Sequence, residues 1–94
     1  MVRVLIERRI DPKMEAPYQK LMREMRGAAL HMPGFISGET LQDSSDPHHY
    51  FLISTWRTRG GWDKWAVTPE RSALRTEIAR MLTEPERLTI LEPL

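Results

Sequence analysis

The stretch HYFLISTWR, residues 49–57, decides the fold. It is rich in aromatic and β-branched residues, which favour a β-strand. Side chains alternate between the two faces of a strand. One face of this strand therefore carries Phe51 and Ile53, and the other carries Tyr50, Leu52 and Trp56. The sequence thus predicts a strand in a sheet that is apolar on both faces.

The chain before this strand predicts a strand and a helix. Residues 2–7 alternate, with Val2, Val4 and Ile6 on one face, and this period of two indicates a strand. Asp11-Pro12 ends it. From about residue 14 to residue 31 the apolar positions recur every three or four residues, which indicates an amphipathic helix. Pro33-Gly34 ends that helix, since glycine tolerates a left-handed exit.

Further elements lie on both sides of the central stretch. Residues 35–42 predict a second strand, followed by a polar turn over residues 43–47. Thr58 is positioned to cap a short helix that carries Trp62 and Trp65. Thr68-Pro69-Glu70 combines a cap, a first-turn proline and a first-turn acid, so it predicts a helix that runs to about Thr83. Residues 88–91 suggest a last strand.

The element order β-α-β-β-α-α-β predicts an α+β fold. Right-handed crossovers place the helices on one face of a four-stranded antiparallel sheet, the ferredoxin-like split βαβ plan. With 94 residues, 40% of them hydrophobic and 29% charged, the chain is expected to form a single domain over residues 1–94.

Composition also narrows the class of function. A formal net charge of +1 provides no electrostatic case for a nucleic acid or an anionic membrane as partner. The chain has no cysteine, which excludes disulfides, Cys-ligated metals and a thiol nucleophile. No apolar run approaches the roughly 18–20 residues of a membrane span, and the N-terminus is charged too early for a signal peptide. We therefore expect a soluble cytoplasmic protein.

A second apolar sheet face on so small a chain predicts a partner. Burying about 600 Å² of apolar surface per chain is worth on the order of 15 kcal/mol per chain before the cost of association. A homodimer that packs sheet face on sheet face is the simplest arrangement, because an isologous contact uses one patch twice. The alternative is a monomer in which Leu5, Leu52 and Leu91 are merely isolated apolar residues.

The chain resembles the antibiotic biosynthesis monooxygenase (ABM) domain family. The likeness rests on the segments MPGF at residues 32–35, ISTW at residues 53–56 and WDKW at residues 62–65, and it extends over nearly the whole chain. The resemblance implies a dimeric α/β barrel formed by two ferredoxin-like chains, with a cavity in each chain between sheet and helices. It also implies oxidation of aromatic polyketides or quinols with O₂ and no cofactor in some members, and haem degradation in others.

The haem-degrading branch can be compared residue by residue. Its pattern, an Asn late in the first strand, a Trp on the short helix and an axial His about ten residues later, corresponds to Arg8, Trp65 and Arg75. Only the Trp matches. Arginine stays protonated and has no lone pair for iron. Haem binding is therefore the least favoured alternative, and we expect neither a metal nor another cofactor.

Candidate site residues follow from the chemistry of oxygenation without a cofactor, which needs an electron-rich substrate anion, an apolar wall and a base or cation. The predicted walls are Phe35, Tyr50, Trp56 and Trp65. The predicted catalytic groups are Arg75, as the holder of a phenolate or carboxylate, and His49 or His31, as a base. Structural roles are the alternatives: core packing for the tryptophans, a surface ion pair for Arg75 and a helix C-terminal cation for His31.

Two functions remain open from the sequence. The first is a cofactor-independent monooxygenase that acts on a small aromatic or quinol-like compound. The second is a non-catalytic dimeric module that binds a small hydrophobic ligand. Both use the same fold, so fold alone cannot separate them. An enclosed pocket that contains a titratable group favours the enzyme.

Overall fold

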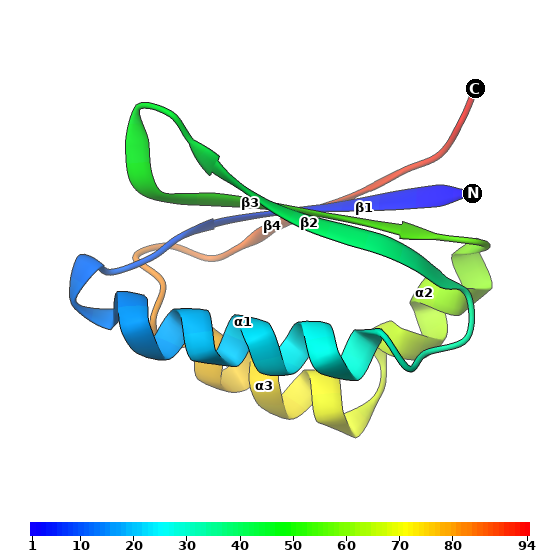
Figure 1. Cartoon of the computed structure of the whole chain (residues 1–94), viewed down its shortest axis with the longest axis horizontal. Coiled ribbons are helices and arrows are strands. Elements are labelled where there is room, and N and C mark those ends of the chain that lie inside the picture. The colour runs from blue at the N-terminus through cyan, green and yellow to red at the C-terminus, as the bar shows by residue number, and fades with distance from the viewer.

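The computed structural model describes residues 1–94 and contains a four-stranded antiparallel sheet with its helices on one side (Figure 1). The strands lie in the order β2-β3-β1-β4. The elements are β1 (Val2–Arg9), a 3₁₀ turn (Pro12–Met14), α1 (Glu15–Ala29), β2 (Phe35–Asp43), β3 (Asp46–Trp56), α2 (Arg59–Ala66), α3 (Pro69–Ala79) and β4 (Arg87–Leu91). This is the predicted ferredoxin-like plan. The sheet of one chain is open rather than closed into a barrel.

Two predicted boundaries are wrong because contacts outside the element set them. Strand β3 begins at Asp46 because the turn is shorter than predicted: the backbone N and the Oγ of Ser45 both donate to Asp43 Oδ1, at 2.8 Å each. Helix α3 ends at Ala79 rather than near Thr83. Beyond it, Leu82 forms a β-bridge with Ile10, and the backbone N of Thr83 donates to the carbonyl of Arg9 at 2.9 Å.

The helix-facing side of the sheet forms the core. In β1, Val2, Val4, Ile6 and Arg8 are buried, whereas the residues between them are exposed or partly exposed. Tyr18, Met22 and Met25 of α1, Trp62 and Trp65 of α2 and Ile78 of α3 pack against this side. At the exit from α1, Gly34 has φ +85°, the left-handed conformation expected from its sequence position.

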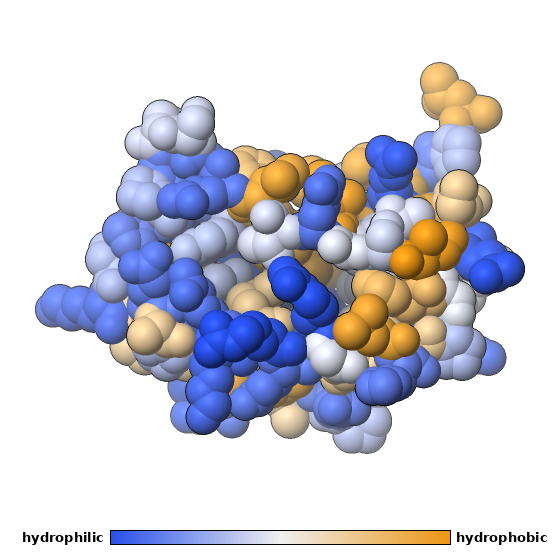
Figure 2. Space-filling view, in the orientation of Figure 1, coloured by the Kyte–Doolittle hydropathy of each residue, from blue (hydrophilic) through white to orange (hydrophobic).

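The other side of the sheet is open and partly apolar. The strand register places Leu5 beside Ile53 and Leu41 beside Phe51, and Leu91 lies 46% exposed at the β4 edge. Figure 2 shows apolar side chains above the sheet, on the side opposite the helices. We call Leu5, Leu41, Phe51, Ile53 and Leu91 the open face. Leu52 does not belong to it: it pairs with Ile6 on the helix side, which corrects its inclusion among the isolated apolar residues.

None of the helices is long and apolar enough to cross a membrane.

Candidate ligand-binding pocket

A cavity of about 80 Å³ lies between the helix side of the sheet and helices α1, α2 and α3. Ten of its seventeen lining residues are hydrophobic. The lining also includes three arginines, Arg8, Arg26 and Arg71. An apolar chamber that contains several cations differs from an ordinary filled core, in which buried charges are rare and paired.

Aromatic side chains form the wall of the cavity nearest α2. The Trp56 ring is fully buried and meets the rings of Phe35 and Trp62 edge-on, with centroids 5.3 Å and 5.9 Å away. Its Nε1 donates to Ser54 Oγ at 3.0 Å. Trp65 lies one turn after Trp62 and lines the same cavity. Such edge-to-face contacts favour a defined arrangement of rings, so this wall is apolar and well ordered.

Local sequence holds helix α2 close to this wall. The side chain of Thr58 caps the helix by accepting from the backbone N of Gly61 at 3.1 Å. A Cβ at Gly61 would lie 3.3 Å from the carbonyl oxygen of Pro33 and 3.6 Å from the Trp56 ring. Glycine at this position therefore lets the helix approach the ring that it covers.

Arg71, on the first turn of α3, is the most unusual group of the cavity. It is only 3% exposed, and its guanidinium carbon lies 5.0 Å from the centroid of the Trp62 ring. Its Nη2 is buried and has no hydrogen-bond partner. Burial lowers the pKa of the Arg71 guanidinium; Arg75 acts in the same direction, whereas Glu86 opposes them. Arginine nevertheless remains charged at neutral pH.

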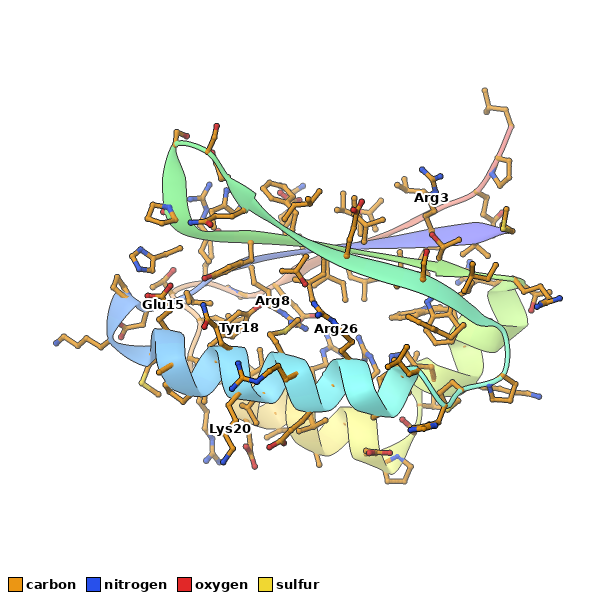
Figure 3. The ribbon with its side chains drawn as sticks, in the orientation of Figure 1. Arg3, Arg8, Glu15, Tyr18, Lys20 and Arg26 are labelled. Carbon is orange, nitrogen blue, oxygen red and sulfur yellow. The ribbon has the colours of Figure 1, made fainter.

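Arg8, in contrast, has its charge matched. Its Nε donates to Glu86 Oε1 at 3.2 Å, and its Nη1 lies 3.0 Å from Met22 Sδ and 3.5 Å from the Tyr18 hydroxyl. Figure 3 shows Arg8 and Tyr18 between the sheet and α1, whereas Arg3 extends from the open side. Burial raises the pKa of the Tyr18 hydroxyl, and the charge of Arg8 opposes this rise. Tyr18 is therefore a neutral partner of Arg8 at pH 7.

Arg26 marks the rim of the cavity. Its Nη2 donates to Thr40 Oγ1 at 2.9 Å, an exposed bond that joins α1 to β2. In Figure 3 the Arg26 side chain rises from α1 towards the sheet. Its charge remains hydrated, so it contributes less to the interior than the charges of Arg8 and Arg71.

The structure brings together only part of the predicted site. Phe35, Trp56 and Trp65 line the cavity. Tyr50 lies outside the lining: its ring packs at 5.3 Å on Tyr18, and its hydroxyl donates to Glu15 Oε1 at 3.3 Å.

The three predicted catalytic groups also lie outside the cavity lining. Arg75 was expected to face the crevice between α3 and the sheet; its side chain is 50% exposed, its Nε lies 3.4 Å from Glu86 Oε2, and it lines a separate hollow between α3 and the segment before β4. His31 is exposed just beyond the end of α1. His49 is buried on the open side of the sheet rather than on the helix side.

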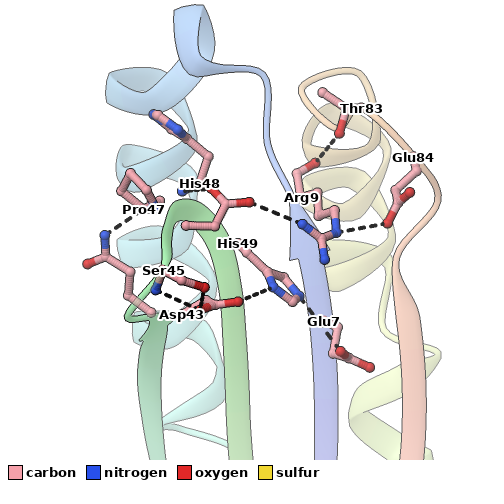
Figure 4. A network of polar contacts seen from close by, with 11 residues as sticks. Glu7, Arg9, Asp43, Ser45, Pro47, His48, His49, Thr83 and Glu84 are labelled. Atoms are coloured by element: carbon pink, nitrogen blue, oxygen red, sulfur yellow. Dashed lines mark hydrogen bonds and ion pairs between the residues drawn. The ribbon is translucent and has the colours of Figure 1, made fainter.

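His49 belongs to a polar cluster at the hairpin end of the sheet (Figure 4). Its Nδ1 lies 3.1 Å from Asp43 Oδ2 and its Nε2 lies 3.7 Å from Glu7 Oε1, while the ring packs at 4.4 Å on Phe51. Beside it, Arg9 joins Asp46 and Glu84. These contacts hold the β2–β3 hairpin to β1. No group of three His, Cys, Asp or Glu residues has the geometry to hold a metal ion.

The hairpin cluster leads to a prediction about acid stability. Hydrogen bonds from the backbone and side chain of Ser45, and then from His49, lower the pKa of the Asp43 carboxyl to about 2. A carboxyl whose pKa is lower in the folded state stabilises that state above its unfolded pKa, near 4, and loses the effect as the pH falls through about 2. We therefore expect Asp43→Asn to lower the stability measured by urea unfolding at pH 6, and the difference from wild type to disappear towards pH 2.

Glu24→Gln, a substitution at an exposed carboxylate on α1 that forms no ion pair, is the matched control for this experiment. A stability difference between wild type and Asp43→Asn that stays constant from pH 6 to pH 2 would contradict the assignment.

Sequence reasoning missed Arg8 and Arg71 as members of the cavity. Both residues stand at positions that the periodicity of their strand or helix assigns to the inward face. Arg8 continues the inward alternation of Val2, Val4 and Ile6, and Arg71 stands three and seven positions before the apolar Leu74 and Ile78 of α3. A charged residue in register with a core face is expected to be paired or functional.

The sequence matches the model of one protein family, and the structure is similar to many solved structures. The family model described as antibiotic biosynthesis monooxygenase matches residues 1–77. A search of curated proteins finds no match.

Solved structures match nearly the full chain. One described as an antibiotic biosynthesis monooxygenase has a TM-score of 0.91 at 20% identity, over 100% of this chain and 99% of that one. Rv0793 from Mycobacterium tuberculosis has a TM-score of 0.90 at 22% identity, over 99% and 94%. SnoaB, a cofactor-independent oxygenase from Streptomyces nogalater, has a TM-score of 0.88 at 13% identity, over 99% and 92%. At these identities the structural likeness confirms the ferredoxin-like fold.

Proposed function

The chain belongs to the antibiotic biosynthesis monooxygenase family, and on that premise we propose that it oxidises a small aromatic or quinol-like compound with O₂ without a cofactor. The reaction takes place in the cavity between the sheet and the helices. The observation that supports this proposal most strongly is the buried, unpartnered guanidinium nitrogen of Arg71 in a chamber with a tryptophan wall.

Oxygenation of a phenolate by O₂ requires no covalent participation of a protein side chain. A phenolate transfers an electron to O₂, the two resulting radicals combine to form a C–O bond, and loss of water leaves a quinone carbonyl. Starting from a phenol with a free ring C–H, one oxygen atom enters the product and the other leaves as water. The site must stabilise the phenolate and hold the ring away from bulk water. The charge of Arg71 and the tryptophan wall supply these two conditions.

The cavity must expand for a ring to enter. An apolar cavity of about 150 Å³ holds benzene, and the cavity here measures about 80 Å³. Met22 and Met25 line it from α1 and are unbranched side chains that adapt readily to a change of shape. We expect these two methionines to move when a one-ring or two-ring compound binds.

A second copy of the chain is part of the proposal. The open face leaves Leu41 and Leu91 each 46% exposed in a single chain. An apolar patch on a sheet face that no helix of the chain covers is typical of an interface rather than of a free surface. Packing two open faces together would close the barrel and cover Phe51 and Ile53. Similarity to a family whose sheets pair in this way supports the same arrangement.

A binding module without catalysis is the second candidate. It is favoured by one observation: none of the three histidines lines the cavity, so the chamber holds no imidazole base. In that case the same pocket would retain a small aromatic ligand without converting it.

Oxygen uptake separates the two functions. We expect the protein to accelerate O₂ consumption with members of a panel of naphthols and naphthohydroquinones, above the rate of the same solution without protein. Arg71→Met should lower kcat/KM by about 100-fold, the scale of losing one donor to a developing anion. Binding of the panel without any uptake above background would favour the binding module and exclude this enzyme activity.

A further inference from the structure

The buried arginines of the cavity differ in their partners: Arg8 has an ion pair, whereas Arg71 has none. This difference identifies Arg71 as a candidate ligand-binding residue. Only one buried carboxylate, Glu86, lies near the buried arginines. Its Oε1 accepts from Arg8, and its Oε2 lies 3.4 Å from Arg75 Nε, so its charge is shared between two guanidinium groups, although Oε2 itself has no hydrogen-bond partner. Arg71 is left with a cation–π contact to Trp62 and no ion pair.

An unpartnered charged donor in the interior costs the free energy of its lost hydration. Native proteins rarely leave such a group unsatisfied, and the exceptions are typical of binding and catalytic sites. Arg71 is only 3% exposed, and it lines the same chamber as Trp56, Trp62 and Trp65. A ligand with a flat apolar body and one anionic oxygen would match both features of the chamber.

We propose that Arg71 is the anion-receiving residue of this pocket, and that the pocket therefore selects small aromatic compounds in their singly ionised form over their neutral analogues. The proposal rests on the proposed function only for the identity of the anion as a phenolate. The ring packs in the tryptophan-lined part of the chamber, and the ionised oxygen accepts from Arg71 Nη2.

Selection for the anion has a direct chemical consequence. A fixed positive charge in a region of low dielectric constant favours the ionised form of a nearby acid, so a bound phenol loses its proton at lower pH than in water. The pocket then holds the electron-rich form of the ligand without a dedicated base. This accounts for a chamber in which no histidine is present.

The test uses 4-nitrophenol, whose phenolate absorbs visible light, and its neutral methyl ether 4-nitroanisole as the matched control ligand. We expect wild-type protein to bind the phenolate at least tenfold more tightly than the ether and to lower the pKa of the bound phenol by at least one unit. Arg71→Met should abolish both effects, and Arg71→Lys should retain part of the pKa shift. Arg80→Met removes an exposed arginine from the end of the same helix and should behave as wild type.

Three results would overturn the proposal: equal affinity of wild type for the two ligands, no binding of either at millimolar concentration, or phenolate binding by Arg71→Met as tight as that by wild type. The last would mean that Nη2 merely bonds to water. Circular dichroism establishes that each variant is folded. If Arg71→Met does not fold, the comparison with wild type is made with Arg71→Lys.

The assay contains no oxidisable substrate, so its outcome is independent of turnover. Phenolate selection without oxygen uptake would sustain the role of Arg71 and exclude the oxygenase. Oxygen uptake that is unchanged in Arg71→Met would sustain the oxygenase and exclude this role.

Discussion

Ile53→Lys is expected to dissociate the proposed dimer into single chains. Ile53 lies on β3 near the centre of the open face and pairs with Leu5 of β1. In a symmetric dimer the substitution carries two lysines into the interface, and although Glu39 is the cross-strand neighbour of Ile53 on β2, removing these charges from water still costs several kcal/mol. We expect the dimer dissociation constant to rise by at least about 1,000-fold, which corresponds to about 4 kcal/mol. Sedimentation velocity at micromolar protein measures the change directly.

Val67→Lys is the matched control for this substitution. Val67 is 80% exposed in the connection between α2 and α3, on the helix side of the fold and outside the open face. This variant should sediment as wild type does. A wild-type protein that sediments as a single chain of 11.0 kDa, or an Ile53→Lys variant that remains a dimer, would contradict the closed-barrel arrangement.

Trp56→Ala is expected to cost about 3–5 kcal/mol of unfolding free energy. Trp56 is fully buried, contacts the rings of Phe35 and Trp62, and donates to Ser54. Its removal leaves a large void beside the existing cavity, where the surroundings can collapse only in part. Small domains have about 5–15 kcal/mol of stability in total, so much of the variant should be unfolded on mild heating.

Urea unfolding followed by circular dichroism measures this loss. Trp56→Phe keeps an aromatic ring at the site and should cost less than half as much. Leu30→Ala, at a residue that is 59% exposed after α1, should cost under about 0.5 kcal/mol. A loss below about 1 kcal/mol for Trp56→Ala would show that the aromatic wall does not support the fold.

Local patterns predicted most of the fold because each element carries its own signal. The alternation of Val2, Val4 and Ile6 identifies β1 and the face that it buries, and Thr68-Pro69 marks the start of α3. The ends of β3 and α3 were wrong because they depend on contacts outside the element. Ser45 tightens the hairpin, and the segment after α3 pairs with the end of β1.

The site was harder to predict than the fold. Helical periodicity places Arg71 and Arg75 one turn apart, and the rotation of α3 against the sheet decides which of them is buried. The pairing of Arg8 with Glu86 joins residues 78 positions apart, so no local pattern reveals it. Aromatic wall residues were easier to identify, since Phe35, Trp56 and Trp65 belong to elements whose inward faces are apolar.

Oxygenation under labelled O₂ tests the proposed activity most directly. Each naphthol of the panel is incubated with protein under ¹⁸O₂, and the quinone product is analysed by mass spectrometry against a sample without protein. We expect a product that carries one ¹⁸O atom, forms in proportion to protein and falls sharply in Arg71→Met. Product formation that is independent of protein for every member of the panel, or a protein-dependent product without ¹⁸O, would exclude oxygenation in this cavity.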